Sequence, residues 1–197
     1  MRMRTTLSVL GMLLLATTSY AQRSDSSTRP TGEVAMSNDT LQLRYISSGE
    51  AVGVGGSRFQ GTFLLTEDRD IVFSGGLLFP TSLDLGRLKL SIGPQLYAAL
   101  LQNKNNDVMA LSVGADLRYL LNRQSGLAIA GQAFYAPDIL TFGSADRVTD
   151  FSARVELNVA PRLVGFGGMR WFEFDLTNGA GKRKLQEELF FGVGYRF

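Results

Sequence analysis

The sequence predicts an all-β fold, a transmembrane antiparallel up-and-down β-barrel, because apolar residues recur at every second position over stretches of about ten residues. Successive side chains of a strand point to opposite faces, so this period gives each strand one apolar face. A tilted membrane strand needs roughly 9 to 11 residues, which these stretches match. The clearest stretch is DFSARVELNV, whose apolar face consists of Phe151, Ala153, Val155, Leu157 and Val159.

The alternation recurs along most of the chain. Residues 87–98 and 109–120 show it clearly, and residues 58–65, 71–79 and 127–135 show it more weakly. The chain ends in ELFFGVGYRF, where one more strand is expected. The apolar face of this last strand consists of Leu189, Phe191, Val193, Tyr195 and Phe197.

The period alone fits two kinds of barrel: one whose apolar faces contact lipid, and a soluble barrel of the lipocalin kind whose apolar faces lie inside. Lipid is favoured because the polar faces combine small residues with opposite charges, a mixture that can fill a narrow interior. The apolar faces also carry aromatic residues near the strand ends, where membrane girdles form. These aromatic residues are Tyr119, Tyr135, Trp171, Tyr195 and Phe197.

The expected number of strands is eight, with ten as the alternative, because bacterial single-chain barrels have even numbers. In the eight-stranded interpretation the spanning set starts at Arg58, and residues 40–46 form an extra piece. A further hairpin near residues 50–56 would give ten strands. Connections counted back from Phe197 alternate between long and short, as expected for outer loops and periplasmic turns.

Two irregularities are predicted within strands. Pro94 cannot donate a ladder hydrogen bond, so a bulge is expected beside Gly93. In MRWFEFDL the apolar face changes from Met169 and Trp171 to residues 172, 174 and 176. A bulge is favoured there over a strand that has already left the bilayer, because a bulge shifts the alternation by one residue.

The first residues predict export to the bacterial outer membrane. Residues 1–21 combine a basic start, an apolar stretch and a Ser-x-Ala site, which is the layout of a signal peptide cleaved after Ala21. A single membrane anchor would need roughly 20 apolar residues, more than this stretch contains. Residues 22–38 are polar and are expected to be mobile, and the barrel is assigned to residues 39–197.

Charge limits the expected partners. The formal net charge of +2 comes from Arg2 and Arg4 of the signal peptide, so nucleic acid is not an expected partner of the mature chain. Outer-membrane lipids are the expected partners. The basic run 182–184 falls in a predicted outer loop, where Lys182, Arg183 and Lys184 could bind lipopolysaccharide phosphates. A solvated loop is the simpler interpretation.

No catalytic site, cofactor or metal is predicted. The chain contains no His and no Cys, which removes the usual base of envelope hydrolases and the usual metal ligands. Asp116, Asp150 and Glu156 could act as acid or base, but each is close to a basic residue of the polar faces, which favours structural ion pairs. The predicted lumen charge network consists of Asp116, Arg118, Arg154, Glu156 and Arg170.

The end of the chain, with its terminal Phe197, resembles the C-terminal signature of bacterial outer-membrane proteins. This resemblance implies recognition by the barrel-assembly machinery.

A second resemblance covers about residues 107–197 clearly and the first half loosely. Residues 135–138, YAPD, are followed by Met169, Arg170 and Trp171. This order resembles the YfaZ family of small outer-membrane proteins, which has a Tyr-small-Pro-Asp stretch and then an aromatic-Arg-aromatic strand. Met169 departs from the first aromatic position. The resemblance implies an outer-membrane barrel and carries no agreed activity.

The expected function is therefore that of a structural or surface-interaction barrel, with a narrow pore for small solutes as the alternative. The interior of an eight-stranded barrel is just wide enough for side chains to fill. The side chains expected to fill it are Gln132, Phe134, Arg154, Glu156 and Arg170.

Overall fold

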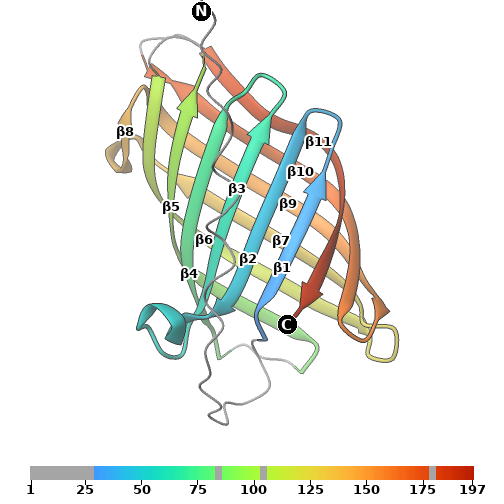
Figure 1. Cartoon of the computed structure of the whole chain (residues 1–197). Helices are drawn as coiled ribbons and strands as arrows, with labels where there is room; N and C mark the ends of the chain where they lie inside the picture. Colours follow the sequence, from blue (N-terminus) through green and yellow to red (C-terminus); the bar gives the residue numbers. More distant parts are fainter. Residues whose placement is uncertain (1–28, 83–85, 103–105, 178–180) are drawn as a thin grey trace, which may run out of the picture.

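A closed antiparallel barrel forms the body of the protein (Figure 1). The computed structural model describes residues 29–82, 86–102, 106–177 and 181–197. Within these ranges, ten of the eleven strands form the ring in sequence order, and the short β8 pairs only with β6. The ring strands are β1 Thr31–Met36, β2 Thr40–Ser48, β3 Arg58–Thr66, β4 Ile71–Pro80, β5 Leu88–Leu101, β6 Asn106–Asn122, β7 Leu127–Ala136, β9 Ala145–Ala160, β10 Leu163–Leu176 and β11 Gly181–Arg196.

Short elements complete the described chain. The 3-10 helix η1, Gly49–Val52, lies between β2 and β3, and η2, Asp138–Leu140, precedes β8, Thr141–Gly143. Among the described residues, no helix is long and apolar enough to cross a membrane. We call the end where β1 begins and β11 finishes the lower end, and the opposite end the upper end (Figure 1).

The first strand closes the barrel. β1 pairs with β2 on one side and with β11 on the other, from Thr31 opposite Arg196 to Met36 opposite Phe191. The ring therefore has ten strands rather than the expected eight, and residues 40–46 belong to β2 instead of forming an extra piece. The expectation that residues 22–38 are mobile is wrong for residues 31–36, which are strand. The signal peptide predicted at residues 1–21 lies outside the described residues.

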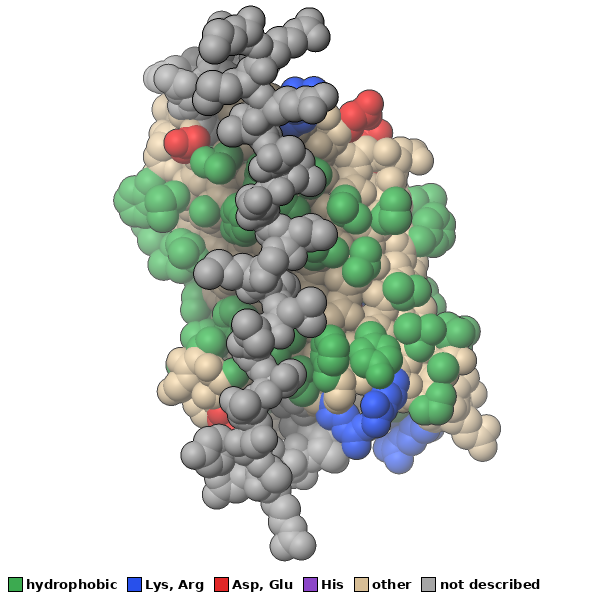
Figure 2. All heavy atoms as spheres, in the orientation of Figure 1, with side chains coloured by type: hydrophobic (Ala, Val, Ile, Leu, Met, Phe, Trp, Pro, Cys, Tyr) green, Lys and Arg blue, Asp and Glu red, His purple; other side chains and the backbone are tan. Residues whose placement is uncertain are grey.

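Alternation places apolar side chains outside and polar ones inside. On β9, Val155 is 49% exposed whereas its neighbour Glu156 is 6% exposed. On β11, Phe191 is 68% exposed and the adjacent Phe190 is buried. Figure 2 shows apolar side chains over the outer wall between the two ends. The apolar faces thus point outward, and the arrangement of a soluble barrel with those faces inside is not the one observed.

The lumen is nevertheless apolar in its upper part. A cluster of buried apolar side chains fills it, and Phe172 (1% exposed) and Phe174 (0% exposed) from β10 are among the largest members. Polar and charged side chains occupy the middle and lower parts, among them Gln60, Asp150 and Glu156. Buried side chains therefore occupy the lumen at both levels.

The position of Phe172 and Phe174 corrects a prediction about β10. Met169 and Trp171 point outward and Phe172 and Phe174 point inward without a change of parity, and the register of β10 with β9 is continuous from residue 164 to residue 175. The shift lies in the neighbouring strand: Phe172 pairs with Gln186 and Glu173 with Lys184, so Leu185 is the extra residue of a β11 bulge.

The predicted bulge at Pro94 is also wrong. The pairing of β5 with β6 runs without a shift through Gly93 opposite Gly114 and Pro94 opposite Val113. On the β4 side, the pairs on either side of Pro94 keep one register, from Gly76–Gln95 to Phe79–Ile92. The sheet accommodates the missing donor by leaving a gap in the ladder with β4, rather than by inserting a residue.

Longer strands replace most of the predicted outer loops. The basic run 182–184 lies in β11, and residues 145–147 begin β9. Hairpin strands therefore continue the wall of the barrel upward. Charged residues in these segments did not prevent strand formation, because they pair across neighbouring strands. Lys182 of β11, for example, pairs with Glu173 of β10 outside the barrel.

Gly93 provides a test of this packing. A Cβ on this buried residue would lie 1.9 Å from the carbonyl oxygen of Leu77, so Gly93→Ala must push β5 away from β4. We expect the free energy of unfolding, measured in urea with the protein in detergent micelles, to fall by about 1–3 kcal/mol. Gly75→Ala, whose Cβ would meet no atom within 4 Å, is the matched control and should be close to neutral. Equal stabilities of the two variants would contradict the close approach.

Candidate functional site

The lumen contains most of the buried charged groups of the barrel, and one such group lies at its middle. Arg170 of β10 donates from Nε and Nη2 to the two carboxylate oxygens of Asp150 on β9, each at 2.8 Å. Arg170 Nη1 donates to Gln42 Oε1 of β2 at 2.7 Å, and the Tyr97 hydroxyl of β5 donates to Asp150 Oδ2 at 2.8 Å. Four strands are therefore joined across the lumen by one bidentate pair and its two neutral partners.

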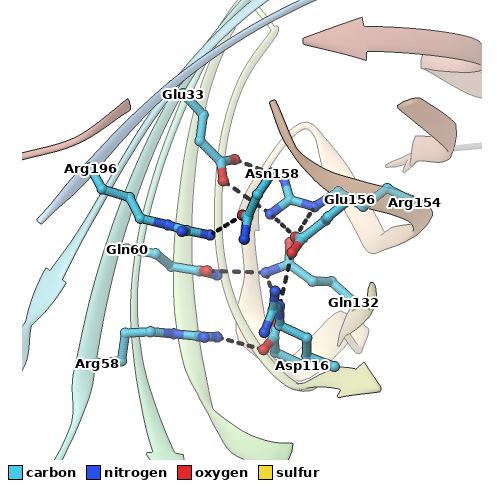
Figure 3. A network of polar contacts seen from close by, with 10 residues as sticks. Glu33, Arg58, Gln60, Asp116, Gln132, Arg154, Glu156, Asn158 and Arg196 are labelled. Atoms are coloured by element: carbon cyan, nitrogen blue, oxygen red, sulfur yellow. Dashed lines mark hydrogen bonds and ion pairs between the residues drawn. The ribbon is translucent and has the colours of Figure 1, made fainter. Parts of the chain in front are cut away.

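A second group lies below, centred on Arg154 of β9. Its Nη1 and Nη2 donate to the two carboxylate oxygens of Glu33 on β1, at 2.7 and 3.0 Å. Its Nε donates to Glu156 Oε1 at 3.0 Å, and Glu156 Oε2 accepts from Arg118 Nε of β6 at 2.8 Å. Figure 3 shows Arg154 between the two carboxylates that it joins. This group ties β1 to β9, whose Arg154 lies 121 residues after Glu33, and through Glu156 also to β6.

A third group crosses the lumen from β3. Arg58 Nη2 donates to Asp116 Oδ1 at 2.6 Å, and Gln132 Nε2 donates to Asp116 Oδ2 at 3.0 Å and to Gln60 Oε1 at 3.1 Å (Figure 3). Gln60 Nε2 in turn donates to Gln95 Oε1 at 2.6 Å. The Gln60 amide thus acts as both donor and acceptor, so the network continues from one wall to the other.

Aromatic rings fill the space around the arginines. The Arg154 guanidinium lies 4.6 Å from the centroid of the Phe166 ring, and the Arg170 guanidinium lies 4.6 Å from that of Phe172. Cation–π contacts of this kind stabilise a desolvated cation. A Cβ on Gly192 would lie 2.4 Å from the Phe166 ring, so glycine is required there for the ring to lie across β11.

The upper mouth is closed by a salt bridge. Arg183 of β11 points into the barrel and donates from Nε and Nη2 to Asp70 Oδ2 at 2.9 and 2.6 Å. Asp70 belongs to the connection between β3 and β4 and is 1% exposed; its Oδ1 accepts from the backbone of Gln102, after β5. Arg183 also donates to Asp68 at 3.0 Å. The β3–β4 connection, the β5–β6 connection and the first part of β11 are therefore held together above the apolar cluster.

One lumenal cation is less well paired. Arg44 of β2 has a buried Nε with no hydrogen-bond partner among the described residues. A cavity of about 10 Å³ lies beside it, with Asp116, Gln132, Ser152 and Arg154 among its lining residues. A cavity of this size holds about one water molecule. Beside Arg44, the described part of the lumen therefore leaves space on the scale of a single water.

The five residues of the predicted charge network all lie in the lumen, in three groups rather than one. Arg154, Glu156 and Arg118 form one group, Asp116 pairs with Arg58, and Arg170 pairs with Asp150. The sequence reasoning missed several partners because pairing across a barrel joins strands that are remote in sequence. These partners are Glu33, Gln42, Arg58, Asp70 and Arg183.

The three carboxylates considered as acid–base candidates are all bound to arginine. Asp116 pairs with Arg58, and Glu156 pairs with both Arg118 and Arg154. Such pairs hold the carboxylates as fixed charges, which suits a structural role. Among the described residues, no group of three or more His, Cys, Asp or Glu side chains has the geometry of a metal site.

The predicted C-terminal face lies on the outside of β11. Leu189, Val193 and Phe197 are 61%, 50% and 63% exposed, and Phe191 and Tyr195 are exposed beside them. The rings of Tyr195 and Phe197 are 5.3 Å apart in an edge-to-face arrangement. The Phe197 backbone N–H donates to the carbonyl of Pro30 at 2.9 Å, so the last residue is fixed against the start of β1.

A closed barrel with an apolar outside and a packed, charged inside is the architecture of outer-membrane-type β-barrels. A comparison with protein families agrees with this class. The family model described as "YfaZ precursor" matches residues 7–197, nearly the whole chain. The chain belongs to the YfaZ family, and the resemblance predicted from Arg170 and its neighbours is confirmed.

Two solved structures resemble the chain at low identity. A "Bacterial polysaccharide outer membrane secretin" has a TM-score of 0.50 and 13% identity, and the match covers 80% of this chain and 56% of that chain. A structure described as "NanC porin structure in rhombohedral crystal form" has a TM-score of 0.41 and 10% identity, with 87% of this chain and 99% of that chain covered. None of the curated proteins compared matches the chain. The first structure supports the fold alone, and the second is too distant to support an argument.

The central pair can be tested by removing one partner. Arg170→Leu leaves the Asp150 carboxylate, 8% exposed, without its bidentate cation. Breaking a buried pair in this way costs about 3–5 kcal/mol, and we expect that loss in the free energy of unfolding measured in urea. The double variant Arg170→Leu/Asp150→Leu is the control and should recover part of the loss, because no unpaired charge remains. A single variant as stable as the wild type would contradict the pairing.

Proposed function

We propose that this protein is an outer-membrane barrel with a closed lumen, serving a structural or surface-interaction role without catalysis. The observation that carries the proposal is the filling of the lumen. Phe172 and Phe174 occupy its upper part, and arginine–carboxylate groups such as Arg154 with Glu33 span its lower part. A solute would have to displace both layers, and the second layer is held by charge-assisted hydrogen bonds.

The outer wall supports a membrane location. Apolar side chains face outward along the wall, and a closed ring pairs the backbone groups that hydrocarbon cannot solvate. Aromatic residues lie at both levels of the wall: Tyr119 and Tyr195 near the lower end, and Trp171, with its ring 5.4 Å from that of Phe151, higher up. We propose export through a signal peptide cleaved after Ala21, which agrees with the family description as a precursor.

A narrow pore is the second candidate function. It is favoured by the ring of ten strands, two more than the eight expected from the sequence. A ten-stranded ring is wider than the eight-stranded ring on which the sequence argument against a pore depended. The extra width is occupied, however, by large side chains such as Tyr97, which is 0% exposed. Closure therefore rests on packing in the lumen, not on strand number.

The proposed partners follow from the outer surface. Membrane lipids would contact the outward apolar faces, and the barrel-assembly machinery would recognise the outward face of β11 that ends in Phe197. Lipopolysaccharide binding by the basic run 182–184 has less support. Arg183 is turned into the lumen, and Lys182 and Lys184 pair outside with Glu173 and Glu187.

Electrical recording tests the closed lumen. Purified protein that gives a heat-modifiable band, and is therefore folded, is added to a planar bilayer. We expect no discrete conductance steps from the wild type or from Arg154→Gln. Steps in the wild type whose size changes in Arg154→Gln would contradict the closed lumen and support the pore.

Charge on the outer wall tests the membrane location. Val155 lies midway along the outward apolar face of β9, between Phe151 and Val159. Val155→Arg would place a cation near the middle of the hydrocarbon, at a cost of roughly 2–4 kcal/mol, whereas Val159→Arg lies near the lower edge and should cost less. We expect the first variant to lose most of its heat-modifiable form in outer-membrane fractions and the second to retain it. Equal recovery of both variants would count against contact with lipid.

A further inference from the structure

The lower end carries exposed cations that the lumen networks do not use. Arg87 lies in the connection between β4 and β5, Arg123 in the turn between β6 and β7, and Arg162 in the turn between β9 and β10. All three are exposed, and we call them the basic rim. Figure 2 shows Lys and Arg side chains gathered along this edge of the molecule. None of the three forms a salt bridge with a carboxylate within the described ranges.

The three turns of the basic rim are joined to one another. Arg123 Nη2 donates to the Gly86 carbonyl at 3.5 Å, which brings it beside the connection that contains Arg87. On the other side, the Asn158 backbone donates to the Ser125 carbonyl at 3.0 Å, which links the β6–β7 turn to the end of β9, close to Arg162. The cations therefore lie along one continuous stretch of the lower edge.

Most outward cations of the upper end differ from the basic rim, because carboxylates pair with them; the exception is the exposed Arg69, which forms no salt bridge among the described residues and stands in the sequence between Asp68 and Asp70. Arg147 pairs with Asp175 at 3.5 Å and Lys182 pairs with Glu173 at 2.6 Å. Lys184 pairs with Glu187. In the part of the lower-end connections that the structure describes, Glu50 is the one carboxylate, and it lies in η1 on another side of the ring. Among the described residues, exposed cations without a nearby carboxylate in the same connection are thus found mainly at the lower edge.

Each cation of the basic rim also adjoins the outward apolar wall. Arg87 precedes Leu88, which pairs with Tyr119, and Arg162 precedes Leu163, which pairs with Tyr195. Arg123 follows closely on Leu121, which is 41% exposed. A long arginine side chain extends from such a position along apolar surface to the level of lipid headgroups.

From this charge and this position we propose that the basic rim binds the phosphate groups of anionic phospholipids in the leaflet at the lower end. The proposal rests on the membrane location proposed above. The acyl chains of these lipids contact Tyr119, Leu121 and Tyr195, and their headgroups then lie at the level of the guanidinium groups. Arginine suits this role because its planar fork binds two oxygens of one phosphate. We assign the lower end, where β1 begins and β11 finishes, to the periplasmic side, so the leaflet is the periplasmic one.

Lipid selectivity measures the proposal directly. The protein is folded into phosphatidylcholine vesicles that contain a trace of spin-labelled phosphatidylglycerol or spin-labelled phosphatidylcholine, and the motionally restricted fraction of each label is compared. We expect the wild type to prefer phosphatidylglycerol by about two- to fivefold, the scale of attraction of one or two arginines at a charged surface. The preference should disappear at high salt, because the contacts are solvent-exposed.

Two triple variants with the same change of net charge locate the effect. Arg87→Gln/Arg123→Gln/Arg162→Gln should lose the preference. Arg147→Gln/Lys182→Gln/Lys184→Gln removes three cations from the upper end and should retain it. Equal preference for the two labels in the wild type, or equal loss in both variants, would overturn the proposal. If the first variant does not fold, the wild type is measured at low and high salt instead. A preference for phosphatidylglycerol that persists at high salt would overturn the proposal.

Two further outcomes separate the proposals from each other. Wild-type protein that gives no heat-modifiable band and no restricted label in any vesicle would refute the membrane location, and the basic rim proposal with it. Wild-type protein that inserts but shows no lipid preference, and instead sediments with peptidoglycan through the same three arginines, would assign the basic rim to a carboxylate-bearing polymer. That result would overturn the lipid proposal and leave the membrane location intact.

Discussion

Pairing between β1 and β11 closes the sheet, and both the inside and the outside of the protein depend on it. Six residue pairs, from Thr31–Arg196 to Met36–Phe191, join the first and the last strand of the ring. Without them two strand edges would expose unpaired N–H and C=O groups, which hydrocarbon cannot solvate. Closure also encloses a lumen. Every second side chain of each strand points into it, and together these side chains fill it.

Filling that lumen explains the combination of residues found there. Ten strands enclose more space than aliphatic side chains of average size occupy, and the chain uses arginine, tyrosine and phenylalanine to span it. Each buried guanidinium must recover the hydration that it loses, which Arg170 does with Asp150 and Gln42, and Arg154 with Glu33 and Glu156. The same contacts that hold the wall together thus occupy the lumen.

The sequence predicted the alternation but not its interruptions. The faces of β9 follow from strict period two, and Arg154 and Glu156 lie inside as expected. β1 was missed because six residues with Gly, Thr and Glu show little apolar periodicity. Arg183 was assigned to a loop; counting by twos from Phe197 would turn it outward, whereas the extra residue Leu185 turns it inward. Salt-bridge partners stayed unpredictable because they join strands that are distant in sequence.

The closing pair also fixes an order of events in folding. Val34 and Val193 face each other at the seam, so an early and a very late part of the chain must meet before the ring exists. Contacts between such remote segments are slow to form, because a long loop has to be closed first. Arg183 lies in β11 and Phe197 follows this strand directly, so the salt bridge at the upper mouth and the seam both form only when the last segment is in place. A chain interrupted before β11 would expose an open edge, making truncated forms prone to aggregate rather than merely less active.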